Sequence, residues 1–401
     1  MVAALVFSTW VAAAQDPDDE ALRRLSAIGY VAGSERAEGT FGVTRNEPEA
    51  TQPGFNLMTS GHGPVALLMN MQGKVVHTWR AEFRSVFPDH PKASAGLKPS
   101  RNFWRIARLL PNGDLIVIWE LYGLFKLDRN SNLLWARPAK AHHALQVAGD
   151  GRIYHLEAAR RQMSEIPEKR SIDDFLVERD ADGNELHRLA ISDALGEIDW
   201  PDLRAAFWER SRNRGYPLTA RGRFDPFHTN ALQILSVEDA ARLGGPFRPG
   251  DALISMAMLD TIAAVDPRSG KVRWWQQGPF GMQHQPRVSL DGKIAVFNNH
   301  HSSERSAVQV FDPRTHRLTW EYAGSERGPL YSKRSGGVEI LANGNFLIIE
   351  TDRGRVLEVT PDKRVVWEYR NSYRVGDEGD RIAGIYSMQR VPESEVEWLE
   401  R

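Results

Sequence analysis

The chain has 401 residues, a formal net charge of −1 and an apolar fraction of 41%. Its charge lies too close to zero for the electrostatic footprint of a nucleic-acid-binding protein, and its apolar content is that of a folded chain. It contains no cysteine, which excludes disulfide bonds, thiolate metal sites and a cysteine nucleophile.

The N-terminus predicts an export signal over residues 1–14. This apolar run ends in Ala12-Ala13-Ala14, the small-residue form of a signal-peptidase site. The run has no basic residue, which indicates a truncated signal; an apolar N-terminus of a cytosolic protein is the alternative. We therefore expect a periplasmic or secreted protein. No later segment reaches the roughly 20 apolar residues of a membrane helix, so we expect no integral membrane segment in the mature chain.

Residues 15–54 predict a short helix followed by a linker. Leu22, Leu25 and Ile28 follow an acidic stretch at helical spacing, which predicts a helix over about 18–29. The remainder is rich in Gly, Glu and Thr without periodicity, and we expect it to cross the surface as a strap or linker.

From residue 55 onward the chain repeats one phrase, in which an apolar strand enters an Asn/Asp-Gly turn and leaves along a second strand. The clearest copies are RIARLLPNGDLIVI, HHALQVAGDGRIYHL, QHQPRVSLDGKIAVF and GGVEILANGNFLII. A second hairpin phrase follows, with Asp-Pro at some of its turns and a Trp after them. We expect these Trp side chains to pack between repeats. Such repeats predict an all-β fold, a β-propeller over residues 55–401.

The repeats predict six blades. Five complete blades are expected at about 105–138, 142–189, 228–277, 284–322 and 337–369. The hairpin around Gly73 has no inner strands before it, and two strands within about 382–399 have no hairpin after them. Together they form the sixth blade, shared between the two termini, which removes exposed sheet edges. A helical insertion at about 158–226 is expected at one rim of the channel.

The repeat also predicts where polar side chains converge. Eight residues before the turn glycines stand Arg105, His143, His284 and Gly336, and equivalent positions face the central channel. His228 and Asn230 share one face of a strand start. The remaining candidates follow the second strand of the next repeat: Asn299, His300, His301 and Arg305.

Imidazole, amide and guanidinium groups gathered in a channel suit an oxyanion such as sulfate, phosphate or carboxylate. His300 and His301 could instead bind a transition metal together with His284, but no carboxylate partner is evident at these positions. We expect neither a metal nor a cofactor. The side chains expected to contact substrate are Asn230, His143, Asn299, His300 and His301.

From about Phe55 to Asn371 the chain resembles the bacterial arylsulfotransferase (arylsulfate sulfotransferase) family. The phrases that carry the resemblance include HTNALQI, GPFGMQHQPRVSLDGKIAVFNN, RSAVQVFDP and SGGVEILANGNFLIIETDRGRVLEVTPDKRVVWEY. The resemblance implies a six-bladed propeller that transfers a sulfuryl group between phenolic compounds, independently of PAPS, through a sulfated histidine. By position it implies catalytic roles for His228, His284 and Arg305.

The chain departs from the family at one place. The resemblance implies a sulfated histidine beyond that arginine, where this chain reads GPLYSKRSGGVEIL, and the remaining His316 stands in a turn expected on the outer rim. Either His284 or His228 is then the nucleophile, or the activity is lost. Three functions stay open: an aryl-sulfate sulfotransferase, a non-catalytic propeller that binds an anionic or aromatic ligand, and a quinone-cofactor dehydrogenase, for which no acidic metal ligands stand out.

Overall fold

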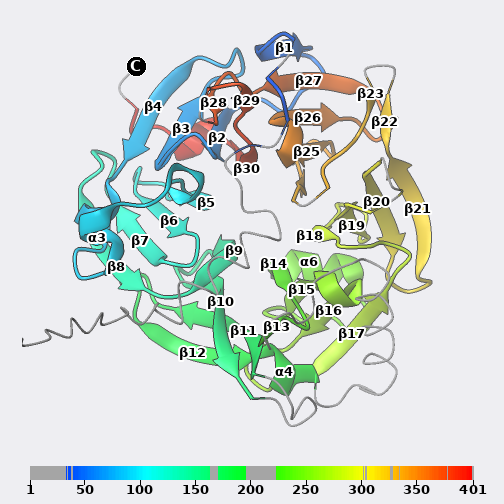
Figure 1. The fold of residues 1–401 in the computed structure, drawn as a ribbon. Helices are drawn as coiled ribbons and strands as arrows, with labels where there is room; N and C mark the ends of the chain where they lie inside the picture. The colour runs from blue at the N-terminus through cyan, green and yellow to red at the C-terminus, as the bar shows by residue number, and fades with distance from the viewer. Residues whose placement is uncertain are drawn as a thin grey trace, which may run out of the picture.

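In the computed structural model, the chain folds into a six-bladed β-propeller around a central axis (Figure 1). The structure describes residues 33–399 except 34, 38, 163–169, 196–222, 301, 303–304, 326–327, 334 and 377. The predicted export signal, the helix over 18–29 and the helical stretch of the insertion lie outside the described residues.

Each blade is an antiparallel sheet whose inner strand lies at the channel, and we number the blades 1 to 6 around the axis. Blade 2 contains β5 (Ile106–Leu109), β6 (Leu115–Trp119), β7 (Gly123–Leu127) and β8 (Leu133–Pro138). Blade 3 contains β9 (Ala141–Val147), β10 (Ile153–Arg161), β11 (Arg170–Arg179) and β12 (Glu185–Ala190), and β13 (Arg223–Phe224) pairs in parallel with β11. Blade 4 contains β14 (Thr229–Ile234), β15 (Ala252–Met256), β16 (Thr261–Val265) and β17 (Val272–Gln277). Blade 5 contains β18 (His284–Val288), β19 (Ile294–Asn298), β20 (Ala307–Asp312) and β21 (Arg317–Tyr322). Blade 6 contains β24 (Gly337–Ile340), β25 (Phe346–Glu350), β26 (Arg355–Val359) and β27 (Val365–Arg370).

Helices in the described residues are short and lie between strands. They are α2 (Phe83–Val86), α3 (Lys92–Ala95), α4 (Ile191–Ala194) and α6 (Val237–Leu243). Two small hairpins, β22 (Gly324–Ser325) with β23 (Gly328–Pro329) and β28 (Arg374–Val375) with β29 (Arg381–Ile382), flank blade 6 in the chain.

Blade 1 is built from both ends of the chain, as predicted, but its division differs from the prediction. The C-terminal part supplies one inner strand, β30 (Ile385–Val391), and the N-terminal part supplies β2 (Phe55–Ser60), β3 (Val65–Met69) and β4 (Val75–Arg80). The second C-terminal strand is absent because Pro392, which has no N–H to donate, ends β30, and a 3₁₀ turn follows. Trp398 instead packs edge-on against Trp79, with ring centroids 5.7 Å apart.

The segment predicted as a linker contributes a further strand. β1 (Gly42–Asn46) pairs with β27 and makes blade 6 five-stranded. The five residues of β1, GVTRN, have no apolar alternation, so the sequence did not predict this strand. This strand covers an edge of blade 6 that would otherwise present unpaired backbone groups.

A ring of equivalent hydrogen bonds joins each blade to the next. In every blade the outer strand carries a Trp or His whose ring N–H donates to a backbone carbonyl in the outer turn of the following blade. The pairs are His77 to Arg129 (2.8 Å), Trp135 to Ala181 (3.3 Å), His187 to Pro267 (2.8 Å), Trp274 to Pro313 (2.9 Å), Trp320 to Pro361 (2.7 Å) and Trp367 to Met71 (3.0 Å). The tryptophans of the second phrase therefore lie between blades, as predicted, and the two histidines take the same place where the repeat lacks Trp.

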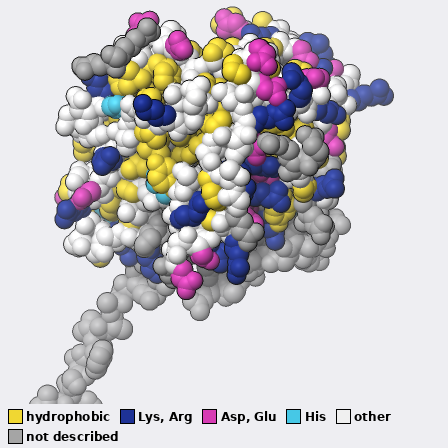
Figure 2. Space-filling view, turned by 90° about the horizontal axis from the view of Figure 1, so that it is seen from above, with side chains coloured by type: hydrophobic (Ala, Val, Ile, Leu, Met, Phe, Trp, Pro, Cys, Tyr) yellow, Lys and Arg dark blue, Asp and Glu magenta, His cyan; other side chains and the backbone are white. Residues whose placement is uncertain are grey.

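The outer surface mixes apolar and charged side chains. Figure 2, seen from the side of β1, β4 and β27, shows Lys and Arg interspersed with Asp and Glu around exposed apolar groups. Val75 and Val76 of β4 are each 38% exposed. Within the described part of the chain, no helix has the length and apolar character needed to cross a membrane.

Candidate functional site

The first residues of the inner strands enclose a small cavity on the propeller axis. Its volume is about 40 Å³, room for a few water molecules at about 10–15 Å³ each. Polar side chains from all six blades line it: Arg105, His143, Asn230, His284, Ser335 and Tyr386. Gly336 lines it as well, so the four positions that the repeat made equivalent do converge.

Three residues around this cavity have strained backbones. His143, His228 and Gln285 adopt left-handed conformations with φ of 52°, 46° and 52°. In each of their blades the register between the inner strand and the next strand shifts at or beside that residue. A bulge re-aims the side chain that it carries, and such strain, about 1–3 kcal/mol per residue, clusters at functional sites. The cavity is thus formed by a departure from regular β-structure.

His284 is held as a neutral imidazole with a defined tautomer. Its Nδ1 lies 3.0 Å from the Met282 carbonyl oxygen and 2.8 Å from Asn299 Oδ1. A carbonyl can only accept, so Nδ1 carries the proton and Nε2 carries the lone pair. Burial lowers the pKa of His284 to about 3 despite the hydrogen bond to Asn299. Asn299 is fixed in turn because its Nδ2 donates to the carbonyls of Ser332 and Ser335.

His228 has the opposite electrostatic character. Its Nδ1 donates to Asp225 Oδ2 over 2.6 Å, and the Asp225 carboxylate also accepts from the His228 backbone N–H. Burial is the largest single influence and opposes the charged ring, but the carboxylates of Asp225 and Asp174 together outweigh it and raise the pKa of His228. The His228 ring does not line the cavity; it lies edge-on to His143 with centroids 5.2 Å apart, and the His143 and His284 centroids are 6.4 Å apart. An imidazole with a raised pKa and one with a lowered pKa therefore both lie next to His143.

Two adjacent histidines, His142 and His143, are joined by a hydrogen bond between their rings. His142 Nδ1 lies 2.8 Å from His143 Nδ1, and His142 Nε2 lies 3.3 Å from Asp174 Oδ1. Burial disfavours the charged form of His142, but Asp174 and more distant carboxylates raise its pKa. Burial and the neighbouring cations Arg105 and His142 hold the pKa of His143 well below its ordinary value. His142 is therefore the donor and His143 the acceptor of this hydrogen bond.

Arg105 supplies the guanidinium of the site. Its Nη2 donates to Ser335 Oγ over 3.1 Å, its Nε lies 3.8 Å from Glu120 Oε2, and its guanidinium carbon lies 4.4 Å from the centre of the Tyr386 ring. Burial raises the pKa of Glu120 in spite of Arg105. The guanidinium of Arg105 therefore lies at the cavity, with the Glu120 carboxylate next to it.

Arg305, predicted to act with His228 and His284, does not lie in this cavity. Its side chain is exposed, and the guanidinium beside the histidines belongs to Arg105. This placement differs from the predicted one because the strand before Arg305 ends at Asn298, and the chain has already left the channel when it reaches residue 305. The catalytic role of Arg305 stays a prediction.

The other predicted substrate-binding residues divide into two groups. Asn230 lines the cavity; its Nδ2 donates to the Gln283 carbonyl, and its buried Oδ1 has no hydrogen-bond partner among the described residues. Asn299 acts behind the cavity through His284. His300 is not part of the cavity lining, and His301 lies outside the described residues.

The sequence reasoning missed three supporting side chains: His142, Asp174 and Asp225. Asp225 stands three residues before His228, a spacing that could have identified it. Asp174 lies on the third strand of its blade and gave no such signal. Within the described residues, no group of three or more His, Asp or Glu side chains is placed to hold a metal ion.

Blade 6 contributes no histidine to the cavity. Ser335 and Gly336 occupy the position, and a Cβ on Gly336 would lie 2.6 Å from the Phe297 ring, so a larger side chain does not fit there. His316 lies on the outer rim, as predicted, stacked on Trp274 of blade 4 with centroids 5.9 Å apart.

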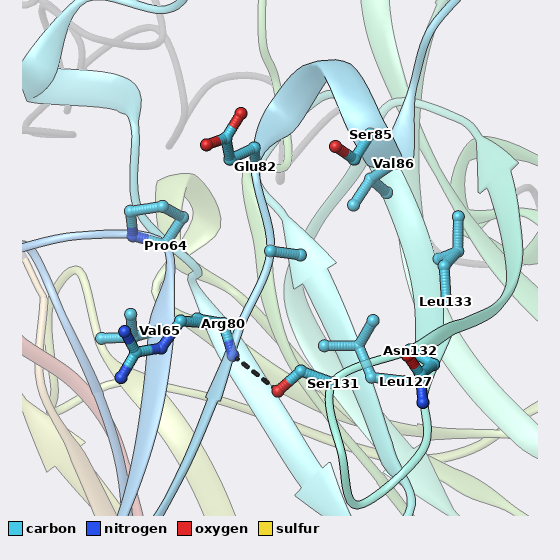
Figure 3. Close-up of a pocket in the computed structure, with 11 residues that line it drawn as sticks. Pro64, Val65, Arg80, Glu82, Ser85, Val86, Leu127, Ser131, Asn132 and Leu133 are labelled. Atoms are coloured by element: carbon cyan, nitrogen blue, oxygen red, sulfur yellow. Dashed lines mark hydrogen bonds between the residues drawn. The ribbon is translucent and has the colours of Figure 1, made fainter.

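A larger hollow, of about 580 Å³, lies on the outside between blades 1 and 2 (Figure 3). Arg80, Glu82, Val86, Leu127 and Leu133 line it, and the Arg80 backbone N–H donates to Ser131 Oγ over 3.2 Å. It contains no histidine, and its lining has no buried cluster of titratable groups. We therefore place the candidate site at the axial cavity.

Comparison with known protein families identifies the family of the chain. The profile of the arylsulfotransferase (ASST) family matches residues 106–372, about two thirds of the chain. The chain belongs to the arylsulfotransferase family. The match spans blades 2 to 6 and includes His143, His228 and His284, whereas Arg105 lies one residue before it.

Solved structures similar to this arylsulfotransferase-family chain show the fold alone. A protein of unknown function from Bacteroides caccae is 11% identical, with a TM-score of 0.53, and the match covers 84% of this chain and 98% of that one. A streptogramin B lyase is 10% identical with a TM-score of 0.45, covering 89% and 95%. Virginiamycin B lyase from Staphylococcus aureus, in a catalytically inactive form with quinupristin, is 9% identical with a TM-score of 0.42, covering 86% and 99%. No curated protein matches the sequence significantly.

Proposed function

We propose that this protein transfers a sulfuryl group from an aryl sulfate to a phenol, without PAPS, through a histidine of the axial cavity. The observation that carries the proposal is that two imidazoles of opposite electrostatic character lie next to His143: His284, which lines the cavity together with Arg105 and has a lowered pKa, and His228, which has a raised pKa. Transfer of this kind requires a nucleophile, a proton donor and groups that stabilise negative charge on the non-bridging oxygens.

In the first half-reaction His284 is the nucleophile. The Nε2 lone pair attacks sulfur, the bond between sulfur and the aryl oxygen breaks, and its electron pair goes to the leaving oxygen. His228, protonated through its contact with Asp225, delivers a proton to that oxygen, so a neutral phenol leaves. The products are sulfated His284, neutral His228 and the phenol.

In the second half-reaction the same groups act in reverse. Neutral His228 takes the proton of the acceptor phenol as its oxygen attacks sulfur, and the bond between Nε2 and sulfur breaks. The lone pair returns to His284 and the proton to His228. The His284 Nδ1–H donates to the Met282 carbonyl and to Asn299 Oδ1 in both steps, and the ring therefore keeps its orientation.

Arg105 and His143 stabilise the charge on the sulfuryl oxygens. With His142 donating to its Nδ1, His143 is neutral and carries its proton on Nε2, which makes it a hydrogen-bond donor and not a nucleophile. The small volume of the cavity suits a sulfuryl group, and the aromatic ring would then lie outside it.

Incubation of the protein with 4-nitrophenyl sulfate and no acceptor tests the proposal. We expect a mass increment of one SO₃ on His284 and release of one equivalent of nitrophenol, followed by turnover when a phenol is added. His284→Asn should remove both, while His228→Asn should slow both half-reactions but leave the adduct detectable. An adduct on His228 would reverse these two roles, and an adduct on a residue outside the cavity would disprove the proposal.

A second candidate function is a propeller that binds an oxyanion or a phenol without turnover. The serine and glycine in place of a blade 6 histidine favour it. In that case sulfate or a phenol would raise the melting temperature, and neither adduct nor turnover would form with any aryl sulfate tried.

We also propose that the protein acts in the periplasm or outside the cell, on the basis of the apolar run and Ala12-Ala13-Ala14. Fractionation of the producing cells, with sequencing of the N-terminus of the mature protein, tests this. A protein that stays in the cytosol with residues 1–14 attached would contradict it.

A further inference from the structure

A second chamber lies at the other end of the channel. The first residues of the inner strands enclose the imidazole cavity, and later residues of the same strands enclose a chamber of about 370 Å³. Arg108, Leu145, Leu232 and Arg287 line both spaces and form the floor between them. The chamber is bordered by α6, next to the central opening in Figure 1, and its volume is within the range of small-molecule sites, about 300–1,000 Å³.

The lining of the chamber carries an excess of positive charge. Four arginines face two carboxylates there: Arg108, Arg242, Arg287 and Arg390 against Asp239 and Glu339. Arg287 is matched by Glu339, with Nε and Oε2 2.9 Å apart, and Arg242 lies 3.7 Å from Asp239.

Arg108 forms no ion pair among the described residues, although the charge of Glu339 acts on it from a greater distance. It donates to the Ala107 carbonyl and to Ser387 Oγ, both neutral, and no described carboxylate lies within 4 Å of its guanidinium. Burial lowers the pKa of Arg108 only to about 10, so it remains charged near neutral pH. Arg108 is half-buried, and a partly buried charge without an ion-pair partner is stabilised by an added counter-charge.

Two further polar atoms of the lining are buried and have no hydrogen-bond partner among the described residues. They are Nη2 of Arg390, a residue that is only 8% exposed, and Oε1 of Gln389. The other guanidinium nitrogens of Arg390 are occupied by Asn56 Oδ1, the Gln52 carbonyl and Glu358 Oε2. A buried donor without a hydrogen-bond partner destabilises the protein, and a bound anion would supply the missing acceptor.

The rest of the wall is aliphatic, with Leu145, Leu232, Val288, Ile340 and Leu341. We infer that the chamber is a second binding site, for a small organic anion whose charged head contacts Arg108 and Arg390 and whose apolar body packs on these aliphatic side chains. The site is separate from the imidazole cavity and does not depend on sulfuryl transfer.

Calorimetric titration with benzoate near neutral pH tests the inference. Gln389→Glu is the decisive variant because it is isosteric, adds a carboxylate inside the chamber and removes no hydrogen bond of the described structure. We expect one benzoate-binding event in the wild-type protein to be weakened at least about tenfold by this change, the effect of losing one charge-assisted contact. His284→Asn, which alters only the imidazole cavity, should leave that event intact.

Gln72→Glu is the matched control, since it makes the same change on an exposed turn of blade 1. It should bind benzoate as the wild type does, and benzyl alcohol, which has the ring without the charge, should not bind. The inference is overturned if benzoate does not bind at all, or if Gln389→Glu binds it as tightly as the wild type. Thermal unfolding of each variant shows whether the fold is kept; we expect Gln389→Glu to melt no lower than the wild type because it supplies Arg108 and Arg390 with a counter-charge.

Discussion

The Nδ1 atoms of His142 and His143 lie 2.8 Å apart, so a hydrogen bond with a single proton joins the two adjacent imidazoles. Asp174, 3.3 Å from the far nitrogen of His142, keeps that proton on His142. A side chain on the third strand of blade 3 thereby decides which nitrogen of His143 carries a proton.

Replacing Asp174 by Asn should lower the pKa of His142, because the nearest carboxylate is lost while the amide oxygen can still accept from the Thr229 N–H. We expect His142 to change from a cation to a neutral ring near neutral pH, measured from ¹⁵N chemical shifts of the imidazoles. The neighbouring Asp173→Asn is the control, since Asp173 bonds to Ser192. A His142 that stays cationic in Asp174→Asn would show that the ring is charged by other groups.

Replacing Arg105 by Gln should reduce turnover of an aryl sulfate by about 10²–10³-fold, the usual effect of removing one donor to a developing oxyanion. Arg305→Gln, at the exposed position where the sequence had placed the arginine of the site, should change kcat/KM little. Steady-state kinetics of the two variants compare these positions directly. A larger loss of kcat/KM in Arg305→Gln than in Arg105→Gln would support the prediction that Arg305 acts in the site.

The stability of the protein should fall as the pH drops below about 6.5, in part through His284. Burial lowers the pKa of this ring to about 3, while an unfolded chain titrates near 6.5, so the unfolded state binds more protons between these values. His228, whose pKa is raised, acts in another window: its contribution is full below about 6.5 and is lost as the pH rises through its folded pKa.

His284→Asn should therefore reduce the pH dependence. Between pH values of about 6 and 5, the unfolding equilibrium constant of the wild type should change by up to about tenfold more per pH unit than that of the variant. Urea unfolding midpoints across this range measure it. Equal slopes in the two proteins would mean that His284 titrates normally in the folded state.

Ending the chain at Gly384 should cause aggregation, because β30 is the inner strand of blade 1 and its loss exposes the backbone of β2. A chain ending at Val396 keeps β30 and loses the contacts that Trp398 and Leu399 make with the core, so it should stay monodisperse with a lower melting temperature. Size-exclusion chromatography separates the two outcomes. A soluble, monodisperse protein ending at Gly384 would show that blade 1 does not need its inner strand.

His187→Ala should lower the free energy of unfolding by about 0.5–1.5 kcal/mol, since the hydrogen bond to the Pro267 carbonyl joins blades 3 and 4. His187→Trp should recover most of this loss, because four other blades place an indole N–H in the equivalent position. Chemical denaturation gives both values. A tryptophan variant as unstable as the alanine variant would mean that this position in blade 3 has no room for the larger ring.

The sequence by itself determined the number of blades, the sharing of blade 1 between the termini and the convergence of Arg105, His143 and His284. These follow from a repeat: strands of equal period around one axis must bring equivalent positions together. Local patterns also identified the tryptophans between blades and the outer position of His316.

Only the tertiary structure decided the chemistry of the site. His142, Asp174 and Asp225 set the protonation of the channel histidines through contacts between strands or across a bulge, and no period in the sequence encodes such contacts. Arg305 was misplaced because its distance along the chain from His284 does not show where the strand leaves the channel. The exclusion of a histidine from blade 6 rests on the approach of Phe297 to Gly336, a packing contact between neighbouring blades that exists only in the closed ring.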